Sequence, residues 1–477
     1  MNREPAIEVK NLFYKYPGGD YIFRGAYFEV LRGEHVLVIG DTGSGKSTLV
    51  RILSRTAEFI YRGELSGEIR ILGKNIGEIG FEELQRLVHV IGQNPYLYFT
   101  EHVVRDELYS YALKIYKTSE KAERAVRKVV EATHIYNLVD KYFYELSGGE
   151  AKRVIVARAL IAEPEILLFD EPLMWLDDRG VSDFLDLLKL LRYLGRTVLV
   201  FEHRFLPIIR EFDRVFLLKN GRIYDVSTHA LNVLKETPDP DNSSSTLDSR
   251  TTGREIVKTV NIEHGYNGRI VLKNINLSIK QGDLVLIYGL NGTGKTTLLK
   301  ILAGYLKPKK GRVERKGRIL YIPQNTLLFF TEETVRKEIE MICKTWKKNT
   351  NCIEKGLELV SKQGIPLNRS PFTLSHGQMV KLAIIISGLA GADLVLLDEP
   401  FAGLTYSDRL SLLEYMLSMR DKAFILATST IQGIGRVNWT QAYKLEDGAL
   451  YPFDFESKTS LKWASLVYEA IKNGVGD

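Results

Sequence analysis

Two glycine-rich loops, each with a lysine followed by a hydroxyl residue, are the sequence features with the clearest chemistry. Each loop follows a short apolar run, at 36–39 and at 284–288. The glycines let the backbone curl so that its N–H groups point at phosphate oxygens, and the helix that begins there adds a partial positive charge. The lysine can reach a phosphate chain, and the next serine or threonine can bind Mg²⁺. The predicted binding residues are Gly40, Asp41, Thr42, Gly43, Ser44, Gly45, Lys46, Ser47 and Thr48, and Gly289, Leu290, Asn291, Gly292, Thr293, Gly294, Lys295, Thr296 and Thr297.

An Asp-Glu pair ends a later apolar run in each part of the chain. Asp170 and Asp398 stand where a carboxylate at the end of a strand can reach a metal ion bound at the phosphates. Glu171 and Glu399 follow them directly and are placed to polarise an attacking water. A helix N-cap is the alternative role for such carboxylates, and the two phosphate-binding loops make it the weaker interpretation.

These motifs occur twice and in the same order, which indicates two homologous domains. After each glycine loop come Gln-Asn, then a Leu-Ser-x-Gly segment, then the Asp-Glu pair. Between the two copies, the segment 237–246 is rich in Pro, Ser, Asn and Asp and has no periodicity, as is typical of a linker. We therefore expect a first domain at 1–235, a linker at 236–253 and a second domain at 254–477.

The elements that must position these motifs follow from the apolar pattern. In each half, short β-branched runs alternate with longer segments of helical periodicity. Continuous apolar strands followed by helices are typical of a buried parallel sheet that helices cover. The predicted fold class is therefore α/β.

Composition limits the compartment and the partners. The chain has 477 residues, 45% of them apolar, and a formal net charge of +6. This composition excludes disorder for most of the chain, and the mild charge gives no argument for nucleic acid as a partner. No signal peptide is visible, and no apolar run approaches the roughly 18–20 residues of a membrane span. The two cysteines, Cys343 and Cys352, are too few for a disulfide framework or a cysteine-built metal cluster and indicate a reduced, cytoplasmic setting.

Over nearly all of both halves, this combination of motifs resembles the ATP-binding cassette (ABC) ATPases. The resemblance implies two P-loop NTPase domains, each with a RecA-like core, an antiparallel β-subdomain and a helical subdomain. It implies ATP and Mg²⁺ as cofactors, with two ATP molecules held head to tail between the halves. Each ATP would then lie between the glycine loop of one half and the Leu-Ser-x-Gly signature of the other.

The resemblance also assigns roles to residues outside the glycine loops. Tyr16 and Tyr266 match the aromatic residue that stacks on adenine, although Tyr14 is a rival to Tyr16 and a half-buried strand tyrosine is the alternative for both. The signatures supply Ser147, Gly148, Gly149, Ser375 and Gly377, although a Ser-Gly-Gly segment taken singly is more often a helix N-cap. The implied metal ligands are Ser47, Gln93, Asp170, Thr296, Gln324 and Asp398. The implied catalytic residues are Glu171, His203, Glu399, Gln93 and Gln324.

The two halves differ at positions where the resemblance predicts function. The second half has His376 where the signature has glycine, Thr405 where the first half has an aspartate, and Ser429 where the first half has His203. A short neutral hydroxyl cannot reproduce the reach of an imidazole, and loss of one donor to developing charge costs about 3–4 kcal/mol. We therefore expect the site on the first glycine loop to hydrolyse faster. The alternative is that the bulk of His376 crowds the phosphate and damages this same site more.

An apolar and aromatic stretch follows each Gln-Asn and leads into a charged helix start, at Tyr96–Glu107 and Leu327–Glu338. In ABC importers this region is the groove that receives a coupling helix. The pattern resembles the ATPases of energy-coupling factor (ECF) transporters, which take up vitamins or transition-metal ions through a transmembrane coupling subunit and a substrate-binding membrane subunit. The resemblance implies a peripheral protein at the cytoplasmic face of the membrane. Tyr96–Phe99 departs from the ECF pattern, and ordinary core is the alternative role for its aromatic residues.

Two other functions stay open at this point. A soluble tandem ABC ATPase acting on ribosomes would also have two cassettes and no membrane span, although such proteins carry a long charged linker or an N-terminal cysteine-rich domain. The ATPase of a sugar-type ABC importer is the closer alternative. The transported molecule does not contact such an ATPase, so the sequence does not predict it.

Overall fold

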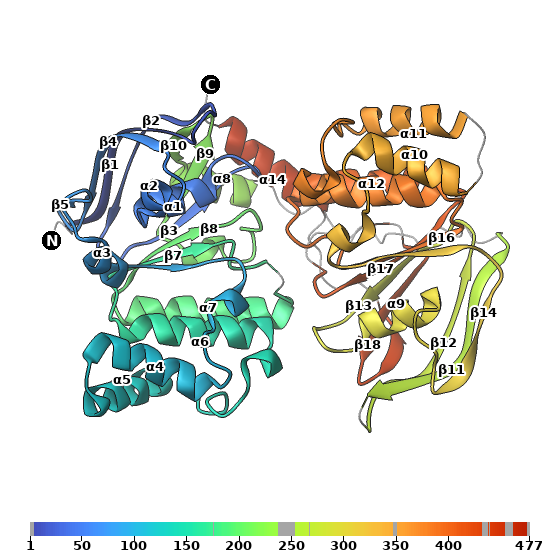
Figure 1. The fold of residues 1–477 in the computed structure, drawn as a ribbon, viewed down its shortest axis with the longest axis horizontal. Helices are drawn as coiled ribbons and strands as arrows, with labels where there is room; N and C mark the ends of the chain where they lie inside the picture. Colours follow the sequence, from blue (N-terminus) through green and yellow to red (C-terminus); the bar gives the residue numbers. More distant parts are fainter. Residues whose placement is uncertain are drawn as a thin grey trace. The chain divides into compact units, whose positions relative to one another are not determined.

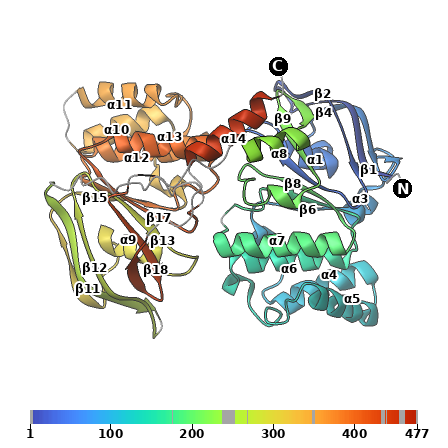
Figure 2. The ribbon, with the colours of Figure 1, turned by 180° about the vertical axis from the view of Figure 1, so that it is seen from behind.

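A computed structural model describes residues 4–174, 176–236, 253–266, 268–346, 351–431, 437, 439–453 and 461–474. The chain divides into two compact units, 1–238 with 466–477 (unit 1) and 239–465 (unit 2) (Figures 1 and 2). The predicted linker at 236–253 lies almost wholly outside the described residues. The segment 466–477, which the sequence analysis assigned to the second domain, is grouped with unit 1. Within the described ranges, every helix is too short or too polar to cross a membrane.

Unit 1 is built on two sheets. A four-stranded antiparallel sheet has the order β2-β1-β4-β5. A six-stranded sheet has the order β10-β9-β3-β8-β7-β6 and is parallel except for β10. The strands are β1 (Pro5–Lys15), β2 (Tyr21–Leu31), β3 (His35–Ile39), β4 (Glu64–Ile71), β5 (Lys74–Asn75), β6 (Val88–Ile91), β7 (Ile166–Asp170), β8 (Thr197–Phe201), β9 (Arg214–Lys219) and β10 (Arg222–Asp225).

Helix α1 (Lys46–Leu53) joins the two sheets into one core, because its Leu49 and Leu53 share a buried cluster with residues of both sheets, among them Ile7 and Val36. Helices α4 (Val104–Tyr116), α5 (Ser119–Ala132), α6 (Gly148–Ile161) and α7 (Asp178–Tyr193) pack on one another beside the parallel sheet (Figure 1). The other helices are α2 (Thr56–Phe59), α3 (Phe81–Leu87) and α8 (Ser227–Glu236), with the 3₁₀ turns η1 (Pro95–Tyr98), η2 (Phe143–Glu145) and η3 (Ile209–Glu211). Helix α14 (Leu461–Asn473) ends in this unit.

Unit 2 repeats the plan. Its antiparallel sheet has the order β12-β11-β14, and its larger sheet has the order β15-β16-β17-β13-β18-β19, parallel except for β19. The elements are β11 (Glu255–Tyr266), β12 (Arg269–Lys280), β13 (Leu284–Tyr288), α9 (Lys295–Ala303), β14 (Lys310–Arg315), β15 (Ile319–Ile322), η4 (Thr326–Phe329), α10 (Val335–Thr345), α11 (Asn351–Lys362), η5 (Pro371–Thr373), α12 (His376–Leu389), β16 (Leu394–Asp398), α13 (Tyr406–Ser418), β17 (Ala423–Thr428), β18 (Gln441–Glu446) and β19 (Ala449–Pro452). The predicted α/β class, with a parallel core, an antiparallel sheet and a helical subdomain in each half, is confirmed.

The expectation of reduced cysteines is wrong in this structure. Cys343 on α10 and Cys352 on α11 form a disulfide with a Cα–Cα distance of 5.9 Å. The two helices pack against each other, which brings the two thiols together although only two cysteines are present. Composition alone argued against a framework of several bonds and could not report this single one.

His35, the first residue of β3, gives unit 1 a predictable acid sensitivity. Its side chain is buried, and burial together with the charge of Arg192 lowers its pKa to about 4. Between about pH 6.5 and pH 4, His35 is therefore protonated in the unfolded chain but not in the folded chain. Because the unfolded chain binds the extra proton, the free energy of unfolding falls as the pH drops through this range, by about 3 kcal/mol at pH 4. Urea unfolding followed by circular dichroism at pH 7 and 4.5 measures the loss. His35→Phe should reduce this pH dependence, and an unchanged dependence in that variant would contradict the assignment.

Candidate nucleotide-binding and hydrolysis sites

Four predicted motifs of unit 1 meet because they follow the carboxyl ends of parallel strands. The glycine loop follows β3, and Asp170 is the last residue of β7. His203 follows β8, and Gln93 follows β6. Since the strands run in the same direction, their ends lie at one edge of the sheet, where α/β proteins bind their ligands.

Hydrogen bonds hold the first glycine loop to itself and to the end of β7. The Lys46 ammonium donates to the carbonyl oxygens of Gly40 and Asp41, at 2.8 and 3.0 Å. The Ser47 hydroxyl donates to Asp170 Oδ1 at 3.0 Å, so the two predicted Mg²⁺ ligands of this half lie together. Burial raises the pKa of Asp170 to about 6, and the hydrogen bond from Ser47 opposes that rise. A Cβ on Gly40 would lie 2.7 Å from the Ser44 hydroxyl, which explains why the loop needs glycine there.

Glu171, the predicted base, lies in a strained and partly buried position. Its φ is +48°, a left-handed conformation that is uncommon for residues other than glycine, and its N–H donates to the Phe201 carbonyl at 2.8 Å. His203 Nδ1 lies 3.7 Å from Glu171 Oε1 and 3.2 Å from Glu202 Oε1. Burial opposes ionisation of Glu171, but the hydrogen bond and charge of His203 and the charge of Lys46 outweigh it and lower the pKa of this carboxyl. The carboxylate is thus kept in the basic form.

Unit 2 brings the equivalent residues together and adds a tyrosine, Tyr321. Lys295 donates to the carbonyls of Gly289 and Leu290 at 2.6 and 3.1 Å, as Lys46 does in its own loop. The Thr296 hydroxyl donates to Asp398 Oδ2 at 2.7 Å, and the Tyr321 hydroxyl donates to the same oxygen at 2.9 Å. A cavity of about 520 Å³ opens here and is lined by Thr296, Lys300, Tyr305, Leu306, Tyr321, Pro323, Gln324, Asn325, Leu328 and Asp398. Gln324 therefore shares a cavity with the predicted Mg²⁺ ligands.

Glu399 repeats the strain of Glu171 but not its electrostatics. Its φ is also +48°. Its Oε2 accepts from the Ser429 N–H at 3.0 Å and from the Ser429 hydroxyl at 3.2 Å, and its Oε1 lies 3.3 Å from the Lys295 ammonium. Burial raises the pKa of Glu399, and the charge of Lys295 offsets it only in part. The two predicted bases therefore differ in how readily they ionise.

The two tyrosines predicted to stack on adenine lie beside the glycine-loop helices. The Tyr16 hydroxyl is 3.3 Å from Thr48 Oγ1 and accepts from Arg51 Nη1 at 2.7 Å. The Tyr266 hydroxyl is 3.4 Å from Thr297 Oγ1, and its side chain is 47% exposed. The rival Tyr14 is fully buried, so it presents no ring face to a ligand.

Both signature serines cap helices, as the simpler interpretation of these segments predicts. Ser147 accepts from the Glu150 N–H at 3.2 Å at the start of α6, and Ser375 accepts from the Gln378 N–H at 3.3 Å at the start of α12. Each keeps its hydroxyl at the exposed N-terminal end of a helix, beside N–H groups that can bind an anion. His376 follows in α12 with its Nε2 buried and without a hydrogen bond among the described residues.

The residues at these sites suit phosphate and Mg²⁺. Several buried polar atoms lack a hydrogen-bond partner within the described part of the chain, and Ser44 Oγ, His203 Nε2 and Asp398 Oδ1 are among those at these sites. Such atoms are costly unless a ligand satisfies them. The described residues hold no cluster of three His, Cys, Asp or Glu side chains that could bind a metal alone. One carboxylate and one hydroxyl per site fit Mg²⁺, which takes its remaining oxygens from phosphate and water.

Comparison with known proteins decides the family. The ABC transporter family profile matches residues 23–174 and 272–402, more than half of the chain. The chain belongs to the ABC transporter ATPase family. Members of this family hydrolyse ATP, so the chain is an ATPase with two cassettes, one in each unit.

Individual relatives agree with this assignment. A protein of Sulfurisphaera tokodaii, provisionally named an ABC transporter ATP-binding protein, is 30% identical over 444 residues, 88% of this chain and 92% of its own. The archaeal ABCE1 in a model of ribosome-bound Pelota and ABCE1 shares the fold, with a TM-score of 0.65 and 22% identity over 97% of this chain and 80% of its own. CbiO1 of Clostridium perfringens, part of the transporter complex CbiONQ, is 28% identical over 49% of this chain and 92% of its own, with a TM-score of 0.45.

The ABC ATPase has a contact at its first glycine loop that the sequence analysis missed. The Tyr468 hydroxyl on α14 donates to Asp41 Oδ1 at 2.9 Å, and the Lys472 ammonium lies 2.8 Å from Asp41 Oδ2. Tyr468 is held there by a ring contact with Phe205 at 5.8 Å. No periodicity or motif links residue 41 to residue 468, so only the folded chain reveals this pair.

Lys472 is expected to support nucleotide binding at the first glycine loop of the ABC ATPase. Lys472→Met leaves the Asp41 carboxylate without its cation beside a loop that receives phosphate anions, so ATP affinity should fall about two- to fivefold. The second loop has the neutral Leu290 at this position. Titration with a fluorescent ATP analogue measures the affinity. Asp41→Asn should restore it in the Lys472→Met background, and a failure of this rescue would count against a charge effect.

Proposed function

We propose that the chain is the fused ATPase subunit of an ECF-type importer and powers uptake of a vitamin or a transition-metal ion through separate membrane subunits. In this proposal two ATP molecules are held head to tail between the cassettes. The signature Ser147 of one half and the glycine loop of the other would form one site, and Ser375 with the first glycine loop would form the other. The protein would act at the cytoplasmic face of the membrane.

The observation that carries the proposal is a pair of exposed leucines at equivalent places in the two cassettes. Leu97 on η1 is 81% exposed, and Leu328 on η4 is 75% exposed, each four residues after the motif glutamine. The aromatic neighbours Tyr98 and Phe99 are half-buried. Repeated exposure of a large apolar side chain at one place supports a partner surface, because burial in a partner is what such a residue gains.

The loops that carry these leucines are held by hydrogen bonds to buried carboxylates. Glu107 Oε2 accepts from the N–H groups of Thr100 and Glu101 at 2.7 and 2.9 Å. In unit 2, Glu338 accepts in the same way from Thr331 and Glu332. Both glutamates are almost fully buried. These hydrogen bonds tie each leucine-bearing loop to the first helix of its helical subdomain, α4 or α10. Such a connection would let a movement of the loop move the helix with it.

Within the proposed site on the first glycine loop, the chain's own side chains have distinct tasks. Lys46 and Ser47 would hold the phosphate chain, and Glu171 would orient and deprotonate the attacking water. His203, with Nδ1 facing carboxylates, would use its unpartnered Nε2 on a γ-phosphate oxygen. Mg²⁺, held by Ser47, Asp170 and Gln93, would supply charge neutralisation at the phosphates. Loss of the γ-phosphate would then weaken the joint between the cassettes and move the partner surfaces.

Capture of membrane partners tests the proposal. The tagged full chain is expressed in its own organism, and detergent-solubilised membranes and ribosomes are both analysed for co-purifying proteins. We expect integral membrane proteins to co-purify. Leu97→Asp with Leu328→Asp should lower their yield about tenfold or more, because a buried carboxylate opposes docking. Leu231→Asp on α8, another exposed leucine, is the matched control and should leave the yield unchanged.

Two results would overturn this function. Recovery of ribosomes without membrane proteins would favour the soluble tandem ATPase instead. Equal recovery of membrane proteins by the Leu97/Leu328 variant and the Leu231 control would show that these leucines are not the coupling surface. Identification of the co-purifying membrane subunits distinguishes an ECF-type importer from a sugar-type one.

A further inference from the structure

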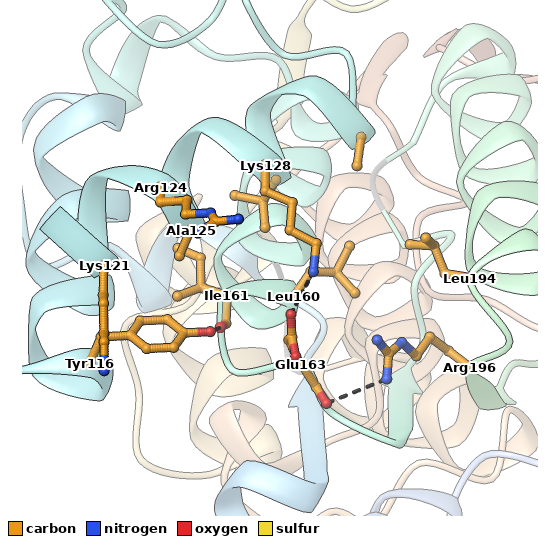
Figure 3. Close-up of a pocket in the computed structure, with 12 residues that line it drawn as sticks. Tyr116, Lys121, Arg124, Ala125, Lys128, Leu160, Ile161, Glu163, Leu194 and Arg196 are labelled. Atoms are coloured by element: carbon orange, nitrogen blue, oxygen red, sulfur yellow. Dashed lines mark hydrogen bonds and ion pairs between the residues drawn. The ribbon is translucent and has the colours of Figure 1, made fainter.

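A second cavity lies in unit 1, away from the glycine loop. It has a volume of about 460 Å³ and lies between α5, the end of α6 and the turn that leads from α7 into β8. Its wall is apolar and includes Val129, Leu160 and Ile161, all almost fully buried. The Tyr116 ring forms another side and is fixed by its hydroxyl, which donates to the Ile161 carbonyl at 2.9 Å (Figure 3). The volume is within the range of small-molecule sites.

The rim of this cavity carries four cations and one carboxylate (Figure 3). Lys128 pairs with Glu163 at 2.6 Å, and Arg196 donates to the carbonyls of Glu163 and Pro164. Within the described ranges, Lys121 and Arg124 have no carboxylate partner. The rim therefore has a formal excess of three positive charges over an apolar wall.

The repeat in unit 2 shows that the fold does not require these cations. Helix α11 corresponds to α5, and the backbone hydrogen bond after each helix sets the register. Ile135 N donates to Val130 O in unit 1, and Ile365 N donates to Val360 O in unit 2, both at 3.2 Å. Residues of the two helices therefore correspond at a constant offset.

At this offset, Glu354 stands where unit 1 has Arg124, and Glu358 stands where it has Lys128. The second unit therefore has carboxylates at two of the places where the first has cations. The cations at Arg124 and Lys128 are thus a property of the first cassette, whereas Lys422 keeps the charge of Arg196 in the second.

We propose that this cavity binds a small organic anion with an apolar body, the anion at Lys121 and Arg124 and the apolar body against the wall formed by α5 and α6. Charge complementarity and an apolar wall together select an amphipathic anion over a neutral molecule or a bare inorganic ion. The site does not overlap the ATP sites. Helix α6 has 14 residues, so about 20 Å separate the signature serine at its start from the cavity at its end. A ligand bound here would nevertheless contact the helix that presents the signature.

Two dyes that differ by one sulfonate test the proposal. The full chain, saturated with Mg-ADP so that the glycine loops are filled, is titrated with 8-anilinonaphthalene-1-sulfonate and with the neutral N-phenyl-1-naphthylamine. We expect one saturable sulfonate site per chain, with the neutral dye bound at least about tenfold more weakly. Lys121→Gln with Arg124→Gln should raise the Kd of the sulfonate at least about tenfold and leave the neutral dye unaffected.

Matched variants keep the test specific. Lys114→Gln with Arg127→Gln removes the same charge from exposed positions on α4 and α5 outside the cavity and should bind both dyes as the parent does. Ala125→Trp, which fills the cavity, should abolish binding of both dyes. ATP hydrolysis at the parent rate shows that each variant is folded. Equal sulfonate affinity in the two double variants, or equal affinity of the two dyes for the parent, would overturn the proposal. So would sedimentation with phosphatidylglycerol vesicles in the absence of a saturable sulfonate site.

Discussion

Glu171→Gln is expected to lower steady-state ATP hydrolysis at least about tenfold, whereas Glu399→Gln is expected to leave about half of it or more. The two glutamates follow equivalent strands and share the same left-handed backbone, so the difference lies in their surroundings. His203 and Lys46 outweigh burial and lower the pKa of Glu171, whereas burial outweighs Lys295 and raises the pKa of Glu399. At neutral pH the first carboxylate is therefore the more fully ionised of the two, which is the form that accepts a proton from water.

Phosphate release by the purified full chain measures this difference. Each variant should still bind a fluorescent ATP analogue, because glutamine preserves the shape of the side chain and removes only the base. Glu120→Gln, an exposed position on α5, is the control for the loss of a carboxylate and should hydrolyse ATP as the parent does.

A larger loss in Glu399→Gln than in Glu171→Gln would contradict this assignment. It would instead support the alternative that His376 impairs the site on the first glycine loop. That side chain follows the signature serine at the start of α12, and burial lowers its pKa. It is therefore a neutral, bulky group where the first half has a glycine.

The sequence could predict contacts between residues that follow the carboxyl ends of parallel strands, because those ends lie at one edge of the sheet. Ser47 and Asp170 are far apart in the sequence, but one follows a glycine loop and the other ends a parallel strand, so both had to lie at one sheet edge. The same reasoning applies to Thr296 and Asp398, and the structure brings both pairs within hydrogen-bond distance. Repetition of the motifs likewise predicted two domains with the same architecture.

The contacts that the sequence could not predict depend on packing without a periodic signal. Tyr321 lies on β15, where the sequence predicts only a tyrosine packed on the core. The pairing of β15 with β16 brings its hydroxyl to Asp398. The α14 residue Lys472 reaches Asp41 because the part of α14 that follows residue 465 belongs to unit 1. The disulfide depends on the pairing of α10 with α11. In each case the contact partner depends on how elements pack in the folded chain, and the local sequence pattern carries no signal of that packing.

His203→Ser is the second substitution for which we expect a large effect, a loss of about 10²–10³ in ATP hydrolysis with nucleotide binding retained. Its Nδ1 lies beside the carboxylates of Glu202 and Glu171, which leaves the buried Nε2 for a phosphate oxygen, and a ring that carries both protons donates from both nitrogens. Serine at this place would behave as Ser429 does in unit 2, where the hydroxyl contacts Glu399 at 3.2 Å and is not available to a phosphate. The substitution would thus give the first site the same residue that the second has at this position.

The reciprocal exchange tests the same cause in the opposite direction. In the Glu171→Gln background, residual hydrolysis comes from the site built on Lys295, and Ser429→His should raise it at least about tenfold because an imidazole regains the missing donor. The Ser429 N–H, which also holds Glu399, is kept in this variant. Phosphate release in the single and double variants gives the answer. If His203→Ser is severe and Ser429→His gives no gain, the asymmetry has its source in the ionisation of Glu399, and the donor argument for the second site fails.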